Sequence, residues 1–179
     1  EGRREIKARK RAWSAWLQAV MEGRREGFTR EGYLKVEAGQ QVDPTDLDFR
    51  TLGPAGSNVF RIENVEHRAV TLGQLLLLQH FFSRFADVNG LMNGWWDRSP
   101  YRKNYHIHKH ELNLYQLVDW IVNPATKPYA CSFVELVALQ PQPTTWFISH
   151  WWGEPVVRFI ACVANHAKLR SLCDLSAYW

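Results

Sequence analysis

Two short segments of the chain bring together residues that could do chemistry. In the first, His106, His108 and His110 alternate along the sequence. Alternate residues of a strand share one face, so three imidazoles could meet one metal ion, and catalytic zinc takes three protein ligands and a water. If the segment is instead a loop, the same histidines form a solvated or hydrogen-bonded surface. Sequence alone leaves both interpretations open.

The second segment consists of His150, Trp151, Trp152, Gly153 and Glu154. It follows an apolar, β-rich run and precedes a stretch typical of a helix. Ligands of open α/β sheets bind beyond the carboxyl ends of strands, and a helix N-terminus attracts anions. His150 and Glu154 could therefore act as acid and base, or position a sugar or phosphate. Alternatively, these side chains only support the fold. Even then, two adjacent tryptophans of a strand cannot both point inward, so we expect at least one of them to be exposed.

The chain has three cysteines, Cys131, Cys162 and Cys173, and no Cys-x-x-Cys pair. An odd and sparse set argues against a secreted disulfide scaffold and against a zinc ribbon. No secretory signal is visible, so we expect an intracellular or organellar protein. Cys131 precedes an expected helix N-terminus, which would lower its pKa. A Cys131–His150 nucleophile pair can be imagined, but no local signature supports it.

The second segment lies inside a strand–helix–strand pattern. The run 145–149 predicts a buried strand, the apolar spacing over 156–170 predicts a helix, and a second apolar run begins at 176–179. Such a unit predicts two parallel strands with a right-handed crossover. We therefore expect a mixed α/β fold, with a helical N-terminal half followed by the beginning of a parallel sheet. The α/β domain, residues 67–179, would be incomplete at its C-terminal end.

Two further helices are predicted upstream of this unit. Thr71 and Gln74 have capping-box spacing and predict a helix over 71–86. A second apolar periodicity predicts a helix over 111–122. The Asn-Pro pair that follows is expected to end it, because proline cannot donate a backbone hydrogen bond.

A third helix and an irregular connector complete the expected elements. Ser132 and Glu135 again have capping-box spacing, which predicts a short helix over 133–139. Residues 27–66 are poorly periodic and punctuated by glycine and proline. They predict a connector with one short strand at 58–62.

Residues 1–26 predict a basic amphipathic helical arm. The first 30 residues hold nine Arg or Lys and four Glu, a net charge of +5, whereas the rest of the chain sums to −1. The apolar positions of the arm, at helical spacing, are Trp13, Trp16, Leu17, Val20 and Met21. We expect this face to pack on the protein itself or on another subunit. A calmodulin-type target helix, nucleic acid and a membrane surface are the alternatives, and the charge favours an acidic partner for residues 1–30.

Composition limits the class of protein. With 179 residues, of which 46% are hydrophobic and 22% charged, the chain is long enough for one domain and is not disordered throughout. Its longest apolar run, 159–164, is far shorter than the roughly 20 residues of a spanning helix, so we expect no transmembrane segment. Tryptophan occurs nine times, and aromatic residues are enriched at protein interfaces.

Several stretches resemble known families. Pro124-Ala125-Thr126, Cys131–Leu136 and Trp146–Pro155, which contains Phe-Ile-Ser-His-Trp-Trp-Gly-Glu-Pro, resemble a large uncharacterised protein family of algae over residues 70–179. The run 147–150, followed by a helix, resembles the opening strand and helix of Toll/interleukin-1 receptor (TIR) domains.

The TIR resemblance implies a flavodoxin-like α/β fold. It also implies either a signalling adaptor that self-associates or an enzyme that cleaves NAD at the nicotinamide–ribose bond. The catalytic glutamate of that family lies farther along the domain and would fall beyond Trp179. Glu154 is therefore not its equivalent.

Two functions are compatible with these observations. The first is a non-catalytic accessory or interaction subunit of a larger protein assembly, anchored by the N-terminal helix and needing no cofactor. The second is a TIR-like signalling module or NAD-cleaving hydrolase, with NAD as its substrate and a site at the His150–Glu154 loop. We favour the first, because the last residues resemble an opening strand and predict that the chain is part of a longer polypeptide.

Overall fold

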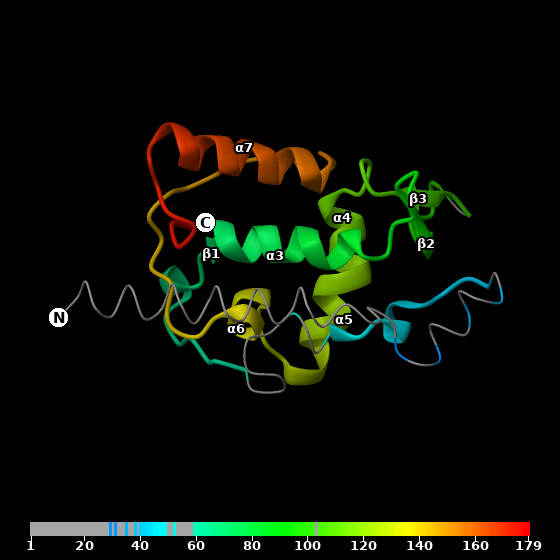
Figure 1. Ribbon diagram of the computed structural model, residues 1–179. Coiled ribbons are helices and arrows are strands. Elements are labelled where there is room, and N and C mark those ends of the chain that lie inside the picture. Colours follow the sequence, from blue (N-terminus) through cyan, green and yellow to red (C-terminus); the bar gives the residue numbers. More distant parts are fainter. Residues whose placement is uncertain are drawn as a thin grey trace.

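The structure, a computed structural model, describes residues 29, 31, 35, 38, 40–49, 52, 59–102 and 104–179 (Figure 1). The predicted arm 1–26 lies outside the described residues, and so does its apolar face of Trp13, Trp16, Leu17, Val20 and Met21. None of the helices in the described part of the chain is long and apolar enough to cross a membrane.

The described elements combine helices with short strands. In chain order, the described α-helices and strands are β1 (Val70–Thr71), α3 (Leu72–Ser83), β2 (Leu91–Trp96), β3 (His106–His108), α4 (Leu114–Leu117), α5 (Asn123–Thr126), α6 (Phe133–Val137), α7 (Val156–Leu169) and β4 (Ala177–Tyr178). The two longest helices, α3 and α7, lie side by side (Figure 1). The β2–β3 hairpin and the short strands β1 and β4 lie at opposite ends of α3.

Helix α3 confirms the capping box expected from sequence. The Thr71 hydroxyl accepts from the Gln74 amide, and the Gln74 side chain accepts from the Thr71 amide, so two otherwise unpaired helix-end donors are satisfied. Gln74 also donates through its side-chain amide to the backbone of Val137 and to Gln142. A buried polar side chain thus links the start of α3 to the chain that leads toward residue 145.

The Asn-Pro pair does not end the second predicted helix. After α4 the chain forms a π-helical turn, Val118–Val122, and then continues into α5. Pro124 therefore lies in the first turn of α5, where its missing N–H is not needed. The turn carries Trp120, whose ring stacks on the buried Trp95 with centroids 4.7 Å apart.

Helix α6 confirms the second capping box, although it ends at Val137 rather than at residue 139. Its Glu135 carboxylate is buried and accepts hydrogen bonds from the amides of Ser132 and Ile62. The Phe60 amide donates to the Glu135 carbonyl. The short strand predicted at 58–62 is wrong for its described residues, 59–62, because this segment is anchored to α6 instead of to a sheet.

The predicted parallel sheet is not confirmed. Within the described residues there are two sheets, and both are antiparallel: β1 pairs with β4, and β2 pairs with β3. The run 145–149 is extended but joins β4 only through an isolated parallel bridge between Trp146 and Tyr178. The expected strand–helix–strand unit is therefore present only as this local parallel contact, and β4 pairs with β1 in the antiparallel direction.

We predict that Glu135 makes folding stability depend on pH. Burial alone would raise the pKa of this carboxyl, but hydrogen bonds from Ile62 and Ser132 and the charge of Arg68 lower it below its ordinary value of 4.5. A lowered folded-state pKa stabilises the fold above pH ~4.5, and this contribution is lost as the pH falls through the folded value. Chemical denaturation of wild type and Glu135→Gln between pH 7 and 3 measures it.

The variant should be less stable than wild type at pH 7, and the difference should shrink in acid. The pKa of Asp97 is also lowered, since hydrogen bonds from Ser99 and Gln116 outweigh its burial, so both proteins keep a residual acid slope. A difference in unfolding free energy that stays constant over the whole pH range would contradict the role given to Glu135.

Candidate functional site

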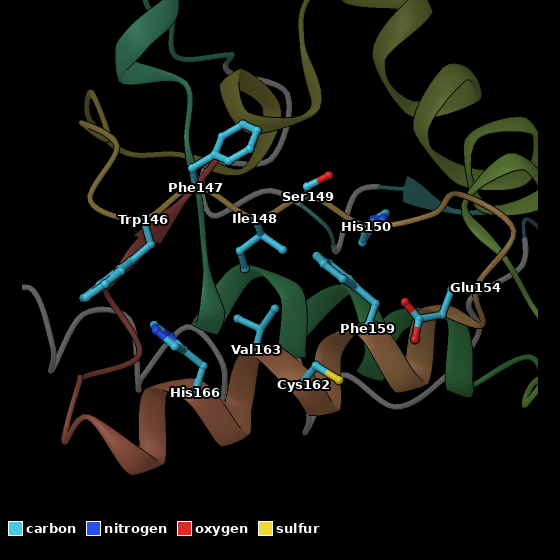
Figure 2. A pocket seen from close by; sticks show the side chains of 10 residues that line it. All are labelled: Trp146, Phe147, Ile148, Ser149, His150, Glu154, Phe159, Cys162, Val163 and His166. Atoms are coloured by element: carbon cyan, nitrogen blue, oxygen red, sulfur yellow. The ribbon is translucent and has the colours of Figure 1, made fainter.

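Side chains alternate along the extended run 146–150. Trp146, Ile148 and His150 point toward α7, whereas Phe147 and Ser149 point away from it (Figure 2). Successive side chains of an extended chain leave on opposite sides. The run thus has an inner face, on α7, and an outer face.

Hydrogen bonds to the C-terminal strand hold this alternation in place. The Trp179 N–H donates to the Trp146 carbonyl, and the Ile148 N–H donates to the Trp179 carbonyl, both at 2.8 Å. The Phe147 and Ser149 amides point the other way and make no hydrogen bond to any described residue. Among the residues that the structure describes, the run is therefore paired on one edge and unpaired on the other.

A cavity of about 310 Å³ lies between the run and α7 (Figure 2). Residues 146–150 line one wall, and Glu154, Phe159, Cys162, Val163 and His166 complete the lining. The His150 ring meets Phe159 edge-on, with ring centroids 4.1 Å apart. The two polar ends of the cavity are distinct, because His150 and Glu154 lie at one end and Trp146 and His166 at the other.

The Trp146 end of the cavity is basic and aromatic. The ring of His166 meets that of Trp146 at 4.8 Å, and the guanidinium of Arg170 lies over the Trp146 ring at 4.9 Å. The Nδ1 atom of His166 lies 3.4 Å from the Tyr178 hydroxyl. Burial, and then the charge of Cys173, raise the pKa of that hydroxyl, so Tyr178 is a neutral hydrogen-bonding group at neutral pH.

Two side-chain nitrogens of the run are buried without a partner in the described residues. They are Nε1 of Trp146 and Nδ1 of His150. Buried polar groups are normally hydrogen-bonded, and an unpaired one costs roughly 1–3 kcal/mol. The inner face therefore leaves two buried hydrogen-bonding groups unpaired among the described residues, and such violations of packing rules are typical of functional sites.

The two tryptophans after His150 both face outward. Trp151 is 73% exposed and Trp152 is 48% exposed. A Cβ atom on Gly153 would come within 2.3 Å of the Trp151 ring, so glycine at this position leaves room for the indole. The Trp152 ring lies against Tyr115, itself exposed, at 5.6 Å. We expected at least one tryptophan of this pair to be exposed, and both are.

The three alternating histidines are not assembled into a metal site. Only 106–108 forms a strand, β3, and His110 lies in the following turn. His108 Nε2 contacts the Asn89 carbonyl at 2.6 Å, and the His110 amide donates to His108 Nδ1. Both ring nitrogens of His108 are engaged, and within the described residues no group of three His, Cys, Asp or Glu side chains could hold a metal ion.

Cys131 differs from its expected chemistry. Burial, and then the charge of Glu135, raise the pKa of its thiol rather than lowering it. It lines a separate cavity with Arg61 and Arg68, away from the one that His150 lines. The proximity of the α6 N-terminus does not outweigh these effects, and the two residues line different cavities, so the structure adds no support for a Cys131–His150 pair.

The structure adds residues that sequence reasoning missed. Of the predicted loop, His150 and Glu154 line the cavity, whereas Trp151, Trp152 and Gly153 do not. Phe159, Cys162 and His166 come from α7 at helical spacing, a pattern that predicts the helix but not the side of it that lines a cavity. Arg170 reaches the site through its contact with the Trp146 ring, and the C-terminal strand reaches it through backbone pairing. No local sequence pattern shows either contact.

Comparison with protein-family models, with curated proteins and with solved structures gives no match. The resemblances to an algal family and to TIR domains therefore stay predictions.

We predict that His108 stabilises the hairpin without metal. His108→Ala should lower the free energy of unfolding by about 1 kcal/mol, because the Asn89 carbonyl and the His110 amide each lose a partner. His106→Ala, at an exposed position of the same strand, is the matched control and should change little. Thermal unfolding of both variants with zinc and with EDTA measures this. A zinc-dependent rise in Tm that both variants abolish would instead restore the metal site.

Proposed function

We propose that this chain is a non-catalytic interaction subunit that binds a partner protein by strand addition at the run 145–149. In strand addition, an extended segment of the partner pairs with an exposed strand edge, and main-chain hydrogen bonds supply the affinity. The observation that carries the proposal is the unpaired edge of this run. The Phe147 and Ser149 amides make no bond to a described residue, whereas Trp146 and Ile148 are bonded to the C-terminal strand.

The edge also lacks the protection that natural sheet edges usually have. Proteins blunt exposed edges with charged side chains, prolines or bulges, because an unprotected edge pairs with other chains. No Asp, Glu, Lys or Arg occurs between Glu135 and Glu154, and the prolines Pro141 and Pro143 precede the run. An uncharged, extended edge of this kind favours a partner strand.

Exposed aromatic side chains surround the edge. Phe147 is 72% exposed and Trp179 is 57% exposed, and their rings lie 6.2 Å apart on the outer face. Trp151 and Trp152 follow directly in the chain. Aromatic residues supply much of the binding energy of protein interfaces, and here they flank the backbone groups that a partner strand would pair with.

A TIR-like NAD-cleaving or signalling module is the second candidate function. It is favoured by the cavity that His150 and Glu154 line together, at the end of a run that α7 connects to a parallel neighbour. Release of nicotinamide from NAD by the full chain would support this candidate. Glu154→Gln would then have to abolish the release for the cavity to be its site.

Strand addition predicts that one backbone amide controls assembly. Ser149→Pro removes the free N–H, whereas Ser149→Ala keeps it and is the matched control. Neither change breaks a described hydrogen bond, and proline is tolerated at strand edges. In a gentle extract of the source cells, the tagged chain and Ser149→Ala should elute as a particle larger than 20.9 kDa. Ser149→Pro should elute near its own mass.

Circular dichroism of the purified variants shows whether both remain folded. Hydrogen exchange of the isolated particle supplies the direct test, since the Phe147 and Ser149 amides should be protected in the particle and not in the free chain. A particle in which these amides exchange as fast as in the free chain would overturn strand addition, whatever its size. A particle made only of this chain would identify the partner strand as a second copy.

A further inference from the structure

We infer that the partner strand carries a basic residue, a large apolar residue and an acidic residue at alternate positions, in that order from N- to C-terminus. This inference rests on the proposed strand addition and adds the side-chain specificity of the same edge. Main-chain bonds give affinity in this mode of recognition, and pockets for alternate side chains give specificity.

The register follows from which backbone groups are free. Phe147 and Ser149 offer their amides to the partner, so Trp146, Ile148 and His150 become the non-hydrogen-bonded positions of an antiparallel pair. At such positions the side chains of the two strands lie closest, with Cα atoms about 4.5 Å apart. The partner's inward side chains therefore lie opposite Trp146, Ile148 and His150, on the α7 side.

The middle position is apolar. Opposite Ile148, the partner's side chain meets the cavity of about 310 Å³ between the run and α7, whose central lining includes Phe159 and Val163. The adjoining Cys162 also lines the cavity, and a free cysteine packs as a small hydrophobic side chain. A phenylalanine-sized side chain would fill this space and remove apolar surface from water, which an alanine could not do.

The two outer positions carry opposite charges. Next to His150 lies Glu154, whose carboxylate has no ion-pair partner among the described residues. Next to Trp146 lies Arg170, which is exposed and held over the indole ring at 4.9 Å. A partner residue opposite His150 would thus meet a negative group, and one opposite Trp146 a positive group.

The direction of the partner follows from this polarity and from pairing energetics. Antiparallel pairs are slightly more stable per residue than parallel ones and more frequent. In the antiparallel arrangement the N-terminal end of the partner lies beside His150 and Glu154, so that the basic residue comes first. Alternate side chains of an extended partner lie about 7 Å apart, the same spacing as the alternate side chains of the run, which is also extended.

Capped peptides test the inference on the full chain. The probe is Thr-Lys-Thr-Phe-Thr-Glu-Thr, in which threonine favours an extended backbone. Titration up to millimolar concentration is followed by NMR of the Phe147 and Ser149 amides. Replacing Phe by Ala in the peptide should weaken binding about tenfold. The reversed sequence, Thr-Glu-Thr-Phe-Thr-Lys-Thr, should bind two- to fivefold more weakly, as expected for exposed ion pairs.

Variants of the protein assign each charge. In Glu154→Gln the peptide's Lys should no longer be preferred over Gln, and in Arg170→Gln its Glu should no longer be preferred over Gln. Lys168→Gln removes an exposed charge from the last turn of α7, close in sequence to Arg170. It is the control variant and should keep both preferences. Raised salt should reduce the preferences but leave the effect of Phe.

The outcomes separate the two proposals. If no peptide perturbs the Phe147 and Ser149 amides, strand addition itself is overturned. If all peptides perturb them with equal affinity, strand addition stands and the side-chain specificity is overturned. A preference for the reversed peptide would overturn the antiparallel direction, and a preference that Lys168→Gln removes as well would overturn the assignment to Glu154 and Arg170.

Discussion

The pairing of the run 145–149 with the C-terminal strand is the constraint on which the candidate site depends. Backbone bonds set the register: Thr145 and Trp146 donate to the Ala177 carbonyl, Trp179 donates to Trp146, and Ile148 donates to Trp179. A slip of one residue would exchange the two faces of the run. Phe147 and Ser149 would then face α7, and Trp146 and His150 would be exposed. One register therefore determines three features: the cavity, the exposed position of Phe147 beside Trp179, and the edge that is unpaired among the described residues.

Local features of the fold could be predicted, because their causes lie within a few residues. The capping boxes of α3 and α6 each need only a side chain three positions from the helix start. The antiparallel pairing of β1 with β4 could not be predicted in this way, because the two strands lie about 107 residues apart in the chain and no local pattern links them. Likewise, Pro124 fails as a stop signal because a π-helical turn precedes it and shifts it into a first turn.

The candidate site shows the same division. His150 and Glu154 could be predicted as neighbours of a strand end, since they follow an apolar run and precede a helix. Their counterparts could not. Helix α7 runs antiparallel to the run 145–149, so its C-terminal end lies beside the start of the run. His166 and Arg170 therefore contact the Trp146 ring, and only the three-dimensional packing brings these side chains together. Of the two interpretations that the sequence leaves open for the histidines at 106–110, the structure agrees with the hydrogen-bonded one, because both ring nitrogens of His108 have backbone partners.

The edge that is unpaired among the described residues is short, because the chain is already hydrogen-bonded before it and turns away after it. Before the run, the chain is already paired, since the Gln142 amide donates to the His67 carbonyl and the Gln142 carbonyl accepts from Ala69. After the run, the Glu154 amide folds back onto the Trp151 carbonyl in a turn, and Pro155 follows. A partner strand can therefore pair only over about 145–150, and such a short segment supplies few main-chain bonds. Selectivity must come from the side chains at its alternate positions, which is why the polar ends and apolar centre of the cavity beside this edge are the features that distinguish one extended partner from another.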